Sequence, residues 1–190
     1  MLSRAFLILL ISSAAIAQTT TAPGSLSVDN DFVHRQFGDS CSLEPKWQPM
    51  IGDLNADGVE DIVIVARCKN ALIDQDEKNY RVIDPLDSYF GYGNPKITTE
   101  FAPDDPKLRG IALLVIHGAG ADAWRSAEPQ AKFVIINLQI KTLTVKKMKL
   151  NRKKSTMAVY VEEAGGDQMT SAIFWDGKKY RYEPLGSSME

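Results

Sequence analysis

The sequence contains few of the residues from which common catalytic and zinc sites are built. It has 190 residues, but only two histidines, His34 and His117, and only two cysteines. A zinc site needs a compact set of nitrogen and sulfur ligands, so this composition argues against zinc. The motif G-x-S-x-G is absent, and no histidine follows His117. Both absences argue against an α/β-hydrolase, in which the nucleophile and then the histidine follow the oxyanion loop.

The chain also lacks an excess of either charge. Its formal net charge is −2, which gives no general attraction to nucleic acid or to anionic membranes. The one basic stretch runs from Lys141 to Lys154 and has no aromatic residue between its charges. We interpret this stretch as a solvent-facing strand and turn whose lysines discourage edge pairing. The alternative is a patch for anionic polysaccharide, phospholipid or nucleic acid. The composition therefore predicts no nucleic-acid partner.

Long apolar runs are missing except at the start of the chain, where the pattern is that of a secretory signal. Arg4 precedes the apolar segment Ala5–Ile16, and Ala15–Ala17 forms an A-x-A cleavage site. Residues 1–17 are therefore predicted to be a signal peptide. A flexible linker is expected over 18–28, a single globular domain over 29–185 and a short tail over 186–190. The mature protein is predicted to be periplasmic or extracellular, without a membrane span.

An acidic, glycine-containing loop runs directly into an apolar strand and is the most informative stretch of the chain. Asp53, Asn55 and Asp57 are spaced by two, Val59 offers a carbonyl, and Asp61 follows. Calcium takes six to eight oxygen ligands, which such a loop supplies. Without a cation, each pair of carboxylates about 5 Å apart repels by roughly 3 kcal/mol. We predict a calcium site here. The alternative is a metal-free loop held by Asx turns.

The two cysteines, Cys41 and Cys68, lie on either side of this loop. An oxidising compartment permits a disulfide between them. Closing the intervening segment would stabilise the fold by roughly 3–4 kcal/mol in the chain-entropy model. We predict the bridge, with two buried free thiols as the alternative.

The rest of the chain reads as a mainly β domain. Three unbroken apolar runs, 62–66, 111–116 and 133–136, are expected to be the central strands. A short helix is expected from Asp29 to Phe37, a bulge near Lys146 and Lys147, and a hairpin with a two-residue turn at Asp176 and Gly177. The fold class is therefore mainly β, bordering on α+β. We expect one domain built on a mostly antiparallel sheet with one short N-terminal helix.

The loop resembles a known family of calcium loops. Its pattern Asp-x-Asn-x-Asp-Gly-x-x-Asp, followed by Ile62-Val63-Ile64-Val65, is similar to the loops of FG-GAP and VCBS repeats. The resemblance implies calcium ligands at Asp53, Asn55, Asp57, the Val59 carbonyl and Asp61. The EF-hand is not matched, because its bidentate glutamate position falls on Ile64. One loop and one short chain do not make a β-propeller.

Taken whole, the layout is similar to exported bacterial proteins of uncharacterised function. The shared features are the Phe37-Gly38 helix end, the acidic loop and the segment from Trp175 to Tyr180. The resemblance implies no catalytic residue. We therefore expect a non-catalytic calcium-binding protein that meets a protein or glycan, through a surface that includes Tyr89, Phe90, Tyr92 and His117. The alternatives are a secreted hydrolase acting on a glycan or ester, and a structural envelope component.

Overall fold

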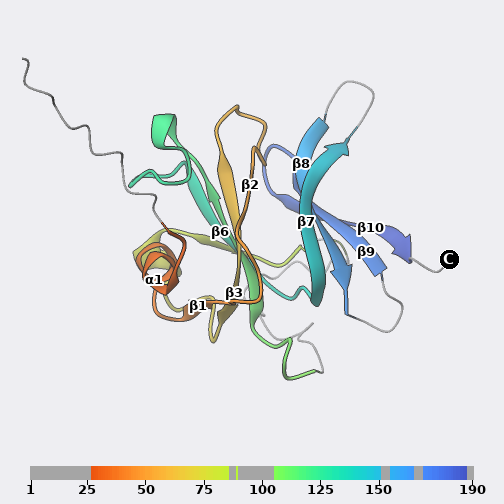
Figure 1. The fold of residues 1–190 in the computed structure, drawn as a ribbon, viewed down its shortest axis with the longest axis horizontal. Coiled ribbons are helices and arrows are strands. Elements are labelled where there is room, and N and C mark those ends of the chain that lie inside the picture. Colours follow the sequence, from red (N-terminus) through yellow and green to blue (C-terminus); the bar gives the residue numbers. More distant parts are fainter. Residues whose placement is uncertain (1–26, 86–88, 90–104, 151–154, 165–168, 188–190) are drawn as a thin grey trace, which may run out of the picture.

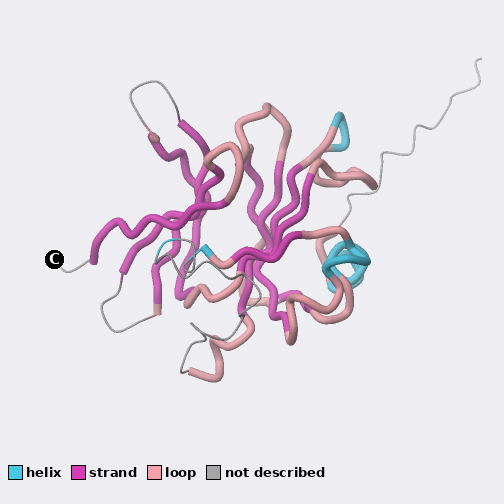
Figure 2. The backbone as a smooth tube through the Cα atoms, turned by 180° about the vertical axis from the view of Figure 1, so that it is seen from behind, coloured by secondary structure: helices cyan, strands magenta, loops and turns pink. Residues whose placement is uncertain are grey.

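The protein is built from two β-sheets that pack face to face, with a helix on the outer side of the first sheet (Figure 1). The computed structural model describes residues 27–85, 89, 105–150, 155–164 and 169–187. The predicted signal peptide, most of the linker and the end of the tail lie outside these residues, as do Phe90 and Tyr92. Seen from behind, the two groups of strands remain distinct, and α1 lies beside one of them (Figure 2).

The first sheet contains six strands in the order β1-β3-β5-β6-β4, and β2 also pairs with β3. Its strands are β1 (Cys41–Leu43), β2 (Met50–Gly52), β3 (Asp61–Cys68), β4 (Arg81–Ile83), β5 (Ile111–His117) and β6 (Ala131–Ile135). The three apolar runs form β3, β5 and β6, so the prediction that they are central is confirmed. All pairings here are antiparallel except that of β4 with β6.

The second sheet is an antiparallel meander in the order β10-β9-β8-β7. Its strands are β7 (Ile140–Lys149), β8 (Ser155–Glu163), β9 (Met169–Trp175) and β10 (Tyr180–Ser187). β10 continues two residues beyond the predicted end of the domain at 185. The prediction of a mainly β, mostly antiparallel fold with one short N-terminal helix is confirmed, although the strands form two sheets rather than one.

The helix α1 (Asn30–Phe37) begins and ends at the residues that the sequence indicates. The Asp29 carboxylate accepts the Phe32 N–H at 2.8 Å, which caps the first turn. Gly38 ends the helix with a φ of 86°. Phe32, Val33 and Phe37 are buried against the first sheet. Two shorter helices are α2 (Gln75–Lys78) and the 3-10 turn η1 (Gly120–Asp122).

Alternate residues of the central strands serve two separate cores. Ile62 and Ile64 of β3 face α1, whereas Val63 and Val65 face the second sheet. The inter-sheet core also contains Ile173 from β9, together with Phe133, Tyr180 and Tyr182. This explains why the central strands are apolar on both faces. None of the helices in the described ranges is long and apolar enough to cross a lipid bilayer.

The bulge predicted near Lys146 and Lys147 is wrong. The β7–β8 ladder runs without interruption from Thr142 to Lys149, and the register shifts instead between Ile140 and Thr142. The prediction assumed that only one face of this strand is apolar. In fact Met148 packs in a small cluster on the outer face of the second sheet, while Leu143 and Val145 pack toward the inter-sheet core.

The two-residue turn predicted for the last hairpin is also wrong. Trp175 pairs with Tyr180, so four residues connect the strands. The Asp176 carboxylate accepts the N–H groups of Lys178 and Lys179 at 2.8 and 2.9 Å, and of the turn residues only Gly177 has a positive φ. The two-residue turn that Asp-Gly usually indicates is of type I′, which needs a positive φ at both residues. The register differs from the predicted one by two residues, which preserves the side-chain alternation, so Tyr180 and Tyr182 still lie on the core-facing side with Ile173.

Candidate functional site

The acidic loop connects β2 to β3 and is folded around its own side chains. The two carboxylate oxygens of Asp53 accept the N–H groups of Asp57 and Gly58 at 3.1 and 3.0 Å. The Asn55 side-chain oxygen shares the Asp57 N–H at 3.1 Å, and the Asn55 amide donates to the Asp57 carboxylate at 2.9 Å. Ala56 and Gly58 take positive φ values of 61° and 85°. The side chains of Asp53, Asn55 and Asp57 are thus gathered in one tight turn.

Asp61 lies at the root of the loop and is fully buried, at 0% exposure. Its carboxylate accepts the N–H groups of Leu54, Asn55 and Gly118 at 2.7, 3.3 and 2.8 Å. Burial raises its pKa to about 6, although the amides of Gly118 and Leu54 lower it, and the charge of Asp57 raises it further. Asp61 therefore connects the loop to both β3 and β5. The negative charge of Asp57, in the loop, acts on the Asp61 carboxylate.

Gly118 follows β5 and approaches the loop so closely that no other residue fits. A Cβ atom at this position would lie 2.3 Å from the Glu60 carbonyl oxygen and 2.8 Å from the Trp124 nitrogen. Because both are main-chain atoms, they cannot move aside without shifting the backbone. The glycine after His117 is therefore required for the Asp61 carboxylate to reach the Gly118 amide.

The donor chemistry of the loop fits a hard cation. Every predicted ligand offers oxygen, and oxygen is what calcium and magnesium bind. In the residues that the structure describes, no three His, Cys, Asp or Glu side chains form a metal-binding group. The predicted calcium ligands are not a group of this kind, because two of them are the Asn55 amide oxygen and the Val59 carbonyl oxygen. Asp53, Asn55 and Asp57 lie in one turn. The Asx-type hydrogen bonds expected for the metal-free alternative are also present.

His117 ends β5 beside the loop and is buried in an aromatic cluster. Its exposure is 1%, and its ring centroid lies 5.0 Å from that of Phe133 and 5.1 Å from that of Trp175. Its Nε2 is 2.7 Å from the Tyr180 hydroxyl. Burial lowers the pKa of His117 to about 4, so the ring is neutral near pH 7. Burial likewise raises the pKa of Tyr180, which stays protonated.

A pocket of about 350 Å³ joins the acidic loop to His117 and to the last hairpin. Its walls come from both sheets, which places it at one end of the sandwich. The lining residues are Asn55, Asp57, Arg81, His117, Gln130, Ala131, Trp175 and Gly177. Gln130 is tied to the loop, because its side-chain oxygen accepts the Asn55 amide at 2.7 Å.

The predicted disulfide is present at the other end of β3. Cys41 and Cys68 are bonded, with a Cα–Cα distance of 4.0 Å, and they face one another in the β1–β3 ladder. The bridge therefore joins neighbouring strands directly. It lies far from the pocket along β3, since Asp61 and Cys68 are the two ends of that strand.

The residues of the predicted binding surface do not lie together in the structure. His117 lines the pocket beside the loop, whereas Tyr89, which is 51% exposed, lines a separate hollow with Pro85, Arg181 and Tyr182. Sequence reasoning missed Arg81, Gln130 and Trp175 as lining residues. They lie in three different elements or connections, and no local spacing relates them to the loop.

No model of a known protein family matches this chain, and searches of curated proteins and of solved structures find no match either. The FG-GAP and VCBS resemblance thus stays a prediction that rests on the loop residues.

Proposed function

We propose that this chain is an exported calcium-binding protein without catalytic activity, which presents a binding module for a glycan or protein. Calcium would be held by Asp53, Asn55, Asp57, the Val59 carbonyl and Asp61. The ion would supply positive charge and rigidity to the loop. The predicted signal peptide, together with a disulfide that fits an oxidising compartment, supports export.

The observation that carries the proposal is the crowding of like charge at the root of β3. Asp53 and Asp57 share one turn, where Asp53 accepts the Asp57 N–H, and the charge of Asp57 raises the pKa of Asp61. The described residues place no lysine or arginine in an ion pair with these three carboxylates. A divalent ion would compensate this charge with ligands that calcium favours.

The pocket also bears on the alternative function, a hydrolase. It joins Asp57 to His117, which is the juxtaposition that a hydrolytic site in this region would need. The lining contains no serine, threonine, cysteine or lysine, and Asp57 is its only carboxylate. Two carboxylates flank the bond in most glycosidases. Within the described lining, these residues support binding rather than turnover.

Calorimetric unfolding of the mature protein tests the calcium proposal. At about 1 mM calcium and a Kd near 0.1 mM, binding adds roughly 1.4 kcal/mol to the free energy of unfolding. This predicts a rise of about 3–5 °C in Tm over a chelated sample. Asp57→Ala should abolish the rise.

The matched control is Asp122→Ala, which removes one exposed carboxylate from η1 outside the loop. This variant should keep the full calcium-dependent rise. Equal midpoints for the wild type in calcium and in chelator would contradict the proposal, as would an equal response of the wild type and Asp57→Ala.

A further inference from the structure

The pocket beside the acidic loop contains an imidazole that is almost fully buried yet has one nitrogen left for a ligand. Nε2 of His117 makes the only hydrogen bond found for this ring in the described part of the chain, to Tyr180. Nδ1 is not among the buried atoms that lack a partner, and the residue lines the pocket. Nδ1 is therefore the ring atom that faces the pocket.

The partner of Nε2 determines which nitrogen carries the proton. His117 is neutral, and Tyr180 is a protonated phenol whose hydroxyl has no other hydrogen-bond partner among the described residues. A buried hydroxyl places its hydrogen on an available acceptor. We therefore assign Nε2 as the acceptor and Nδ1 as the N–H donor. The pocket thus contains one N–H donor, Nδ1 of His117, on a ring whose position is fixed by its burial.

Two further donors border the same pocket. The Arg81 guanidinium lies over the Phe133 ring, 5.0 Å from its centroid, and makes no ion pair with the residues that the structure describes. The Gln130 oxygen is taken by Asn55, so its NH₂ group is the part left to donate. A guanidinium presents a planar fork that matches a carboxylate. These donors favour an anionic group.

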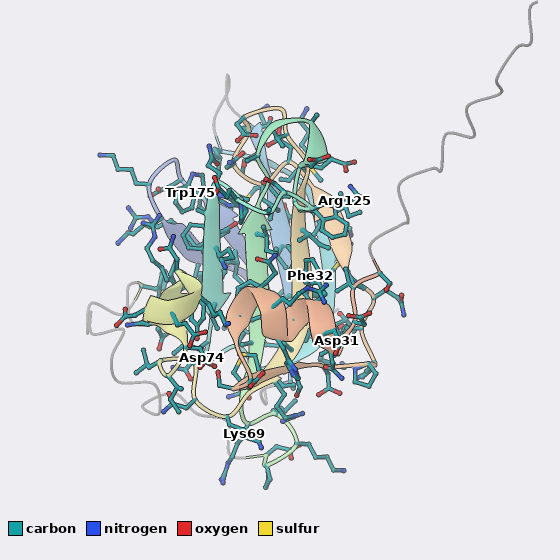
Figure 3. The ribbon with its side chains drawn as sticks, turned by 90° about the vertical axis from the view of Figure 1, so that its left-hand side faces the viewer. Asp31, Phe32, Lys69, Asp74, Arg125 and Trp175 are labelled. Carbon is teal, nitrogen blue, oxygen red and sulfur yellow. A yellow bond between two sulfur atoms is a disulfide. The ribbon has the colours of Figure 1, made fainter. Side chains whose placement is uncertain are left out.

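The remaining walls do not suit a simple anion. Asp57 places a carboxylate in the pocket, which would repel phosphate or sulfate unless a cation lies between them. Trp175 is partly exposed and adds a large apolar ring, which is held edge-on against His117 at 90°. Trp175 lies at the same end of the sandwich as Arg125, and opposite Lys69 (Figure 3). The lining is therefore complementary to a ligand that combines an apolar face, hydroxyl groups that donate hydrogen bonds, and a negative charge.

We propose that this pocket binds a carboxylate-bearing sugar residue of an acidic glycan. The carboxylate meets Arg81, the His117 Nδ1–H and the Gln130 amide, while hydroxyl groups meet Asp57 or a calcium ion on the loop. The C–H face of the ring packs on Trp175. The inference names the ligand class of the proposed binding module and rests on that function, but its anion contacts do not require calcium.

A neighbouring hollow extends the site along the hairpin. It has a volume of about 600 Å³ and shares Arg81 with the pocket. Lys178 and Lys179 also line it and directly follow Gly177 of the pocket. Three positive side chains and one carboxylate, that of Asp76, therefore line this hollow, and its positive excess suits further acidic rings of the same glycan. An oligosaccharide is therefore expected to bind better than a single sugar.

Titration of the mature protein with the trimer of galacturonic acid and with the neutral trimer of galactose tests this inference. Heat of binding is measured in chelator and at a clamped free calcium of 1 mM, because uronates bind calcium themselves. The acidic trimer should bind at least tenfold more tightly than the neutral trimer. Inorganic phosphate and a short glutamate-rich peptide serve as competing anions and should bind at least tenfold more weakly than the acidic trimer.

Variants distinguish the pocket from general charge attraction. Arg81→Gln and Trp175→Ala should each weaken binding of the acidic trimer at least tenfold, and Trp175→Phe should retain more of it than Trp175→Ala. Lys69→Gln removes one positive charge at the opposite end of the sandwich and should leave binding unchanged. Circular dichroism confirms that each variant is folded before titration.

The outcomes separate this inference from the calcium proposal. Equal binding of acidic and neutral trimers, binding of phosphate or peptide as tight as that of the sugar, or no loss in Arg81→Gln and Trp175→Ala would overturn the inference. No binding of the acidic trimer, with an intact calcium-dependent rise in Tm, would also overturn it and leave the calcium proposal standing. Arg81-dependent binding in a protein that shows no response to calcium would support the inference while the calcium proposal fails.

Discussion

The two ends of β3 are held in different ways. At the Cys68 end the strand is covalently joined to β1, and the Cys68 and Lys69 amides donate to Gly110 and Ser40, both at 2.8 Å. At the Asp61 end a single buried carboxylate holds three amides, beside a loop that carries two more carboxylates. The first end is held by a covalent bond. The second is held by a carboxylate whose pKa burial raises to about 6, and it is the end with the pocket.

One strand thus has a covalently fixed end and an end held by a titratable carboxylate. A disulfide constrains the unfolded chain and makes the fold tolerant of strain elsewhere. The polar end carries the free-energy costs of a buried carboxylate and of neighbouring negative charge, as functional sites commonly do.

Replacing Asp61 with alanine should give the largest effect. The change leaves buried N–H groups at Leu54 and Gly118, and a partly buried one at Asn55, without their acceptor. We expect the free energy of unfolding to fall by about 4–5 kcal/mol, as measured by urea denaturation. Asp122→Ala is the control and should stay within about 0.5 kcal/mol of the wild type. A loss below about 1 kcal/mol in Asp61→Ala would show that this carboxylate does not organise the loop.

Removing the disulfide should weaken the fold without altering the polar end. For Cys41→Ala combined with Cys68→Ala, we expect a loss of roughly 3–4 kcal/mol, because 27 positions separate the cysteines. The calcium-dependent rise in Tm should persist in this double variant. Its disappearance would mean that the two ends are coupled rather than independent.

The pH dependence of stability should contain a contribution from His117. Its pKa in the folded protein is about 4, below the ordinary 6.5. Between these values the unfolded chain binds a proton that the native state does not, so stability falls as the pH falls. From pH 7 to pH 5 the loss from this group is about 2 kcal/mol. Urea denaturation in chelator at both pH values measures it.

The control for this pH effect is the variant His117→Gln, in which the side chain at this position does not titrate. Other groups, Asp61 included, contribute equally to both proteins, so the difference between their two pH slopes isolates His117. A variant with the same pH slope as the wild type would exclude a buried neutral imidazole at this position.

The smallest effect concerns local opening at the two ends of β3. Calcium at 1 mM should slow hydrogen exchange at the Asp57 and Gly58 amides about tenfold, which corresponds to roughly 1.4 kcal/mol. Exchange at the Cys68 and Lys69 amides should not change beyond the global effect. Mass spectrometry or NMR resolves the two groups. Uniform slowing at both ends, or none at Asp57, would contradict a site confined to the loop.

Much of the fold follows from local patterns. Asp29 and Gly38 mark the ends of α1, because a carboxylate caps the first amides and glycine takes a positive φ at low cost. The apolar runs of β3, β5 and β6 are buried on both faces, which identifies central strands. The last turn was less predictable, since the Asp176 carboxylate stabilises four residues where Asp-Gly usually indicates two.

The site was predictable only on its loop side. Asp53, Asn55, Asp57 and Asp61 are close in sequence, and their spacing indicates a shared chemistry. Arg81, Gln130 and Trp175 reach the pocket through strand pairing and through the packing of one sheet on the other. The Gly118 contact with Asp61 spans 57 positions, and the Tyr180 contact with His117 spans 63. Such pairs leave no local signal in a single sequence.

The sequence by itself determined the three central strands, the helix with its caps, the oxygen-rich loop and the presence of two cysteines, because each depends on neighbours along the chain. Tertiary structure decided that the strands divide into two sheets, that Asp61 is buried beneath Gly118, and that His117 meets Arg81 and Trp175 at one pocket. The physical reason is that burial and charge depend on what lies nearby in space, and only packing brings those residues together.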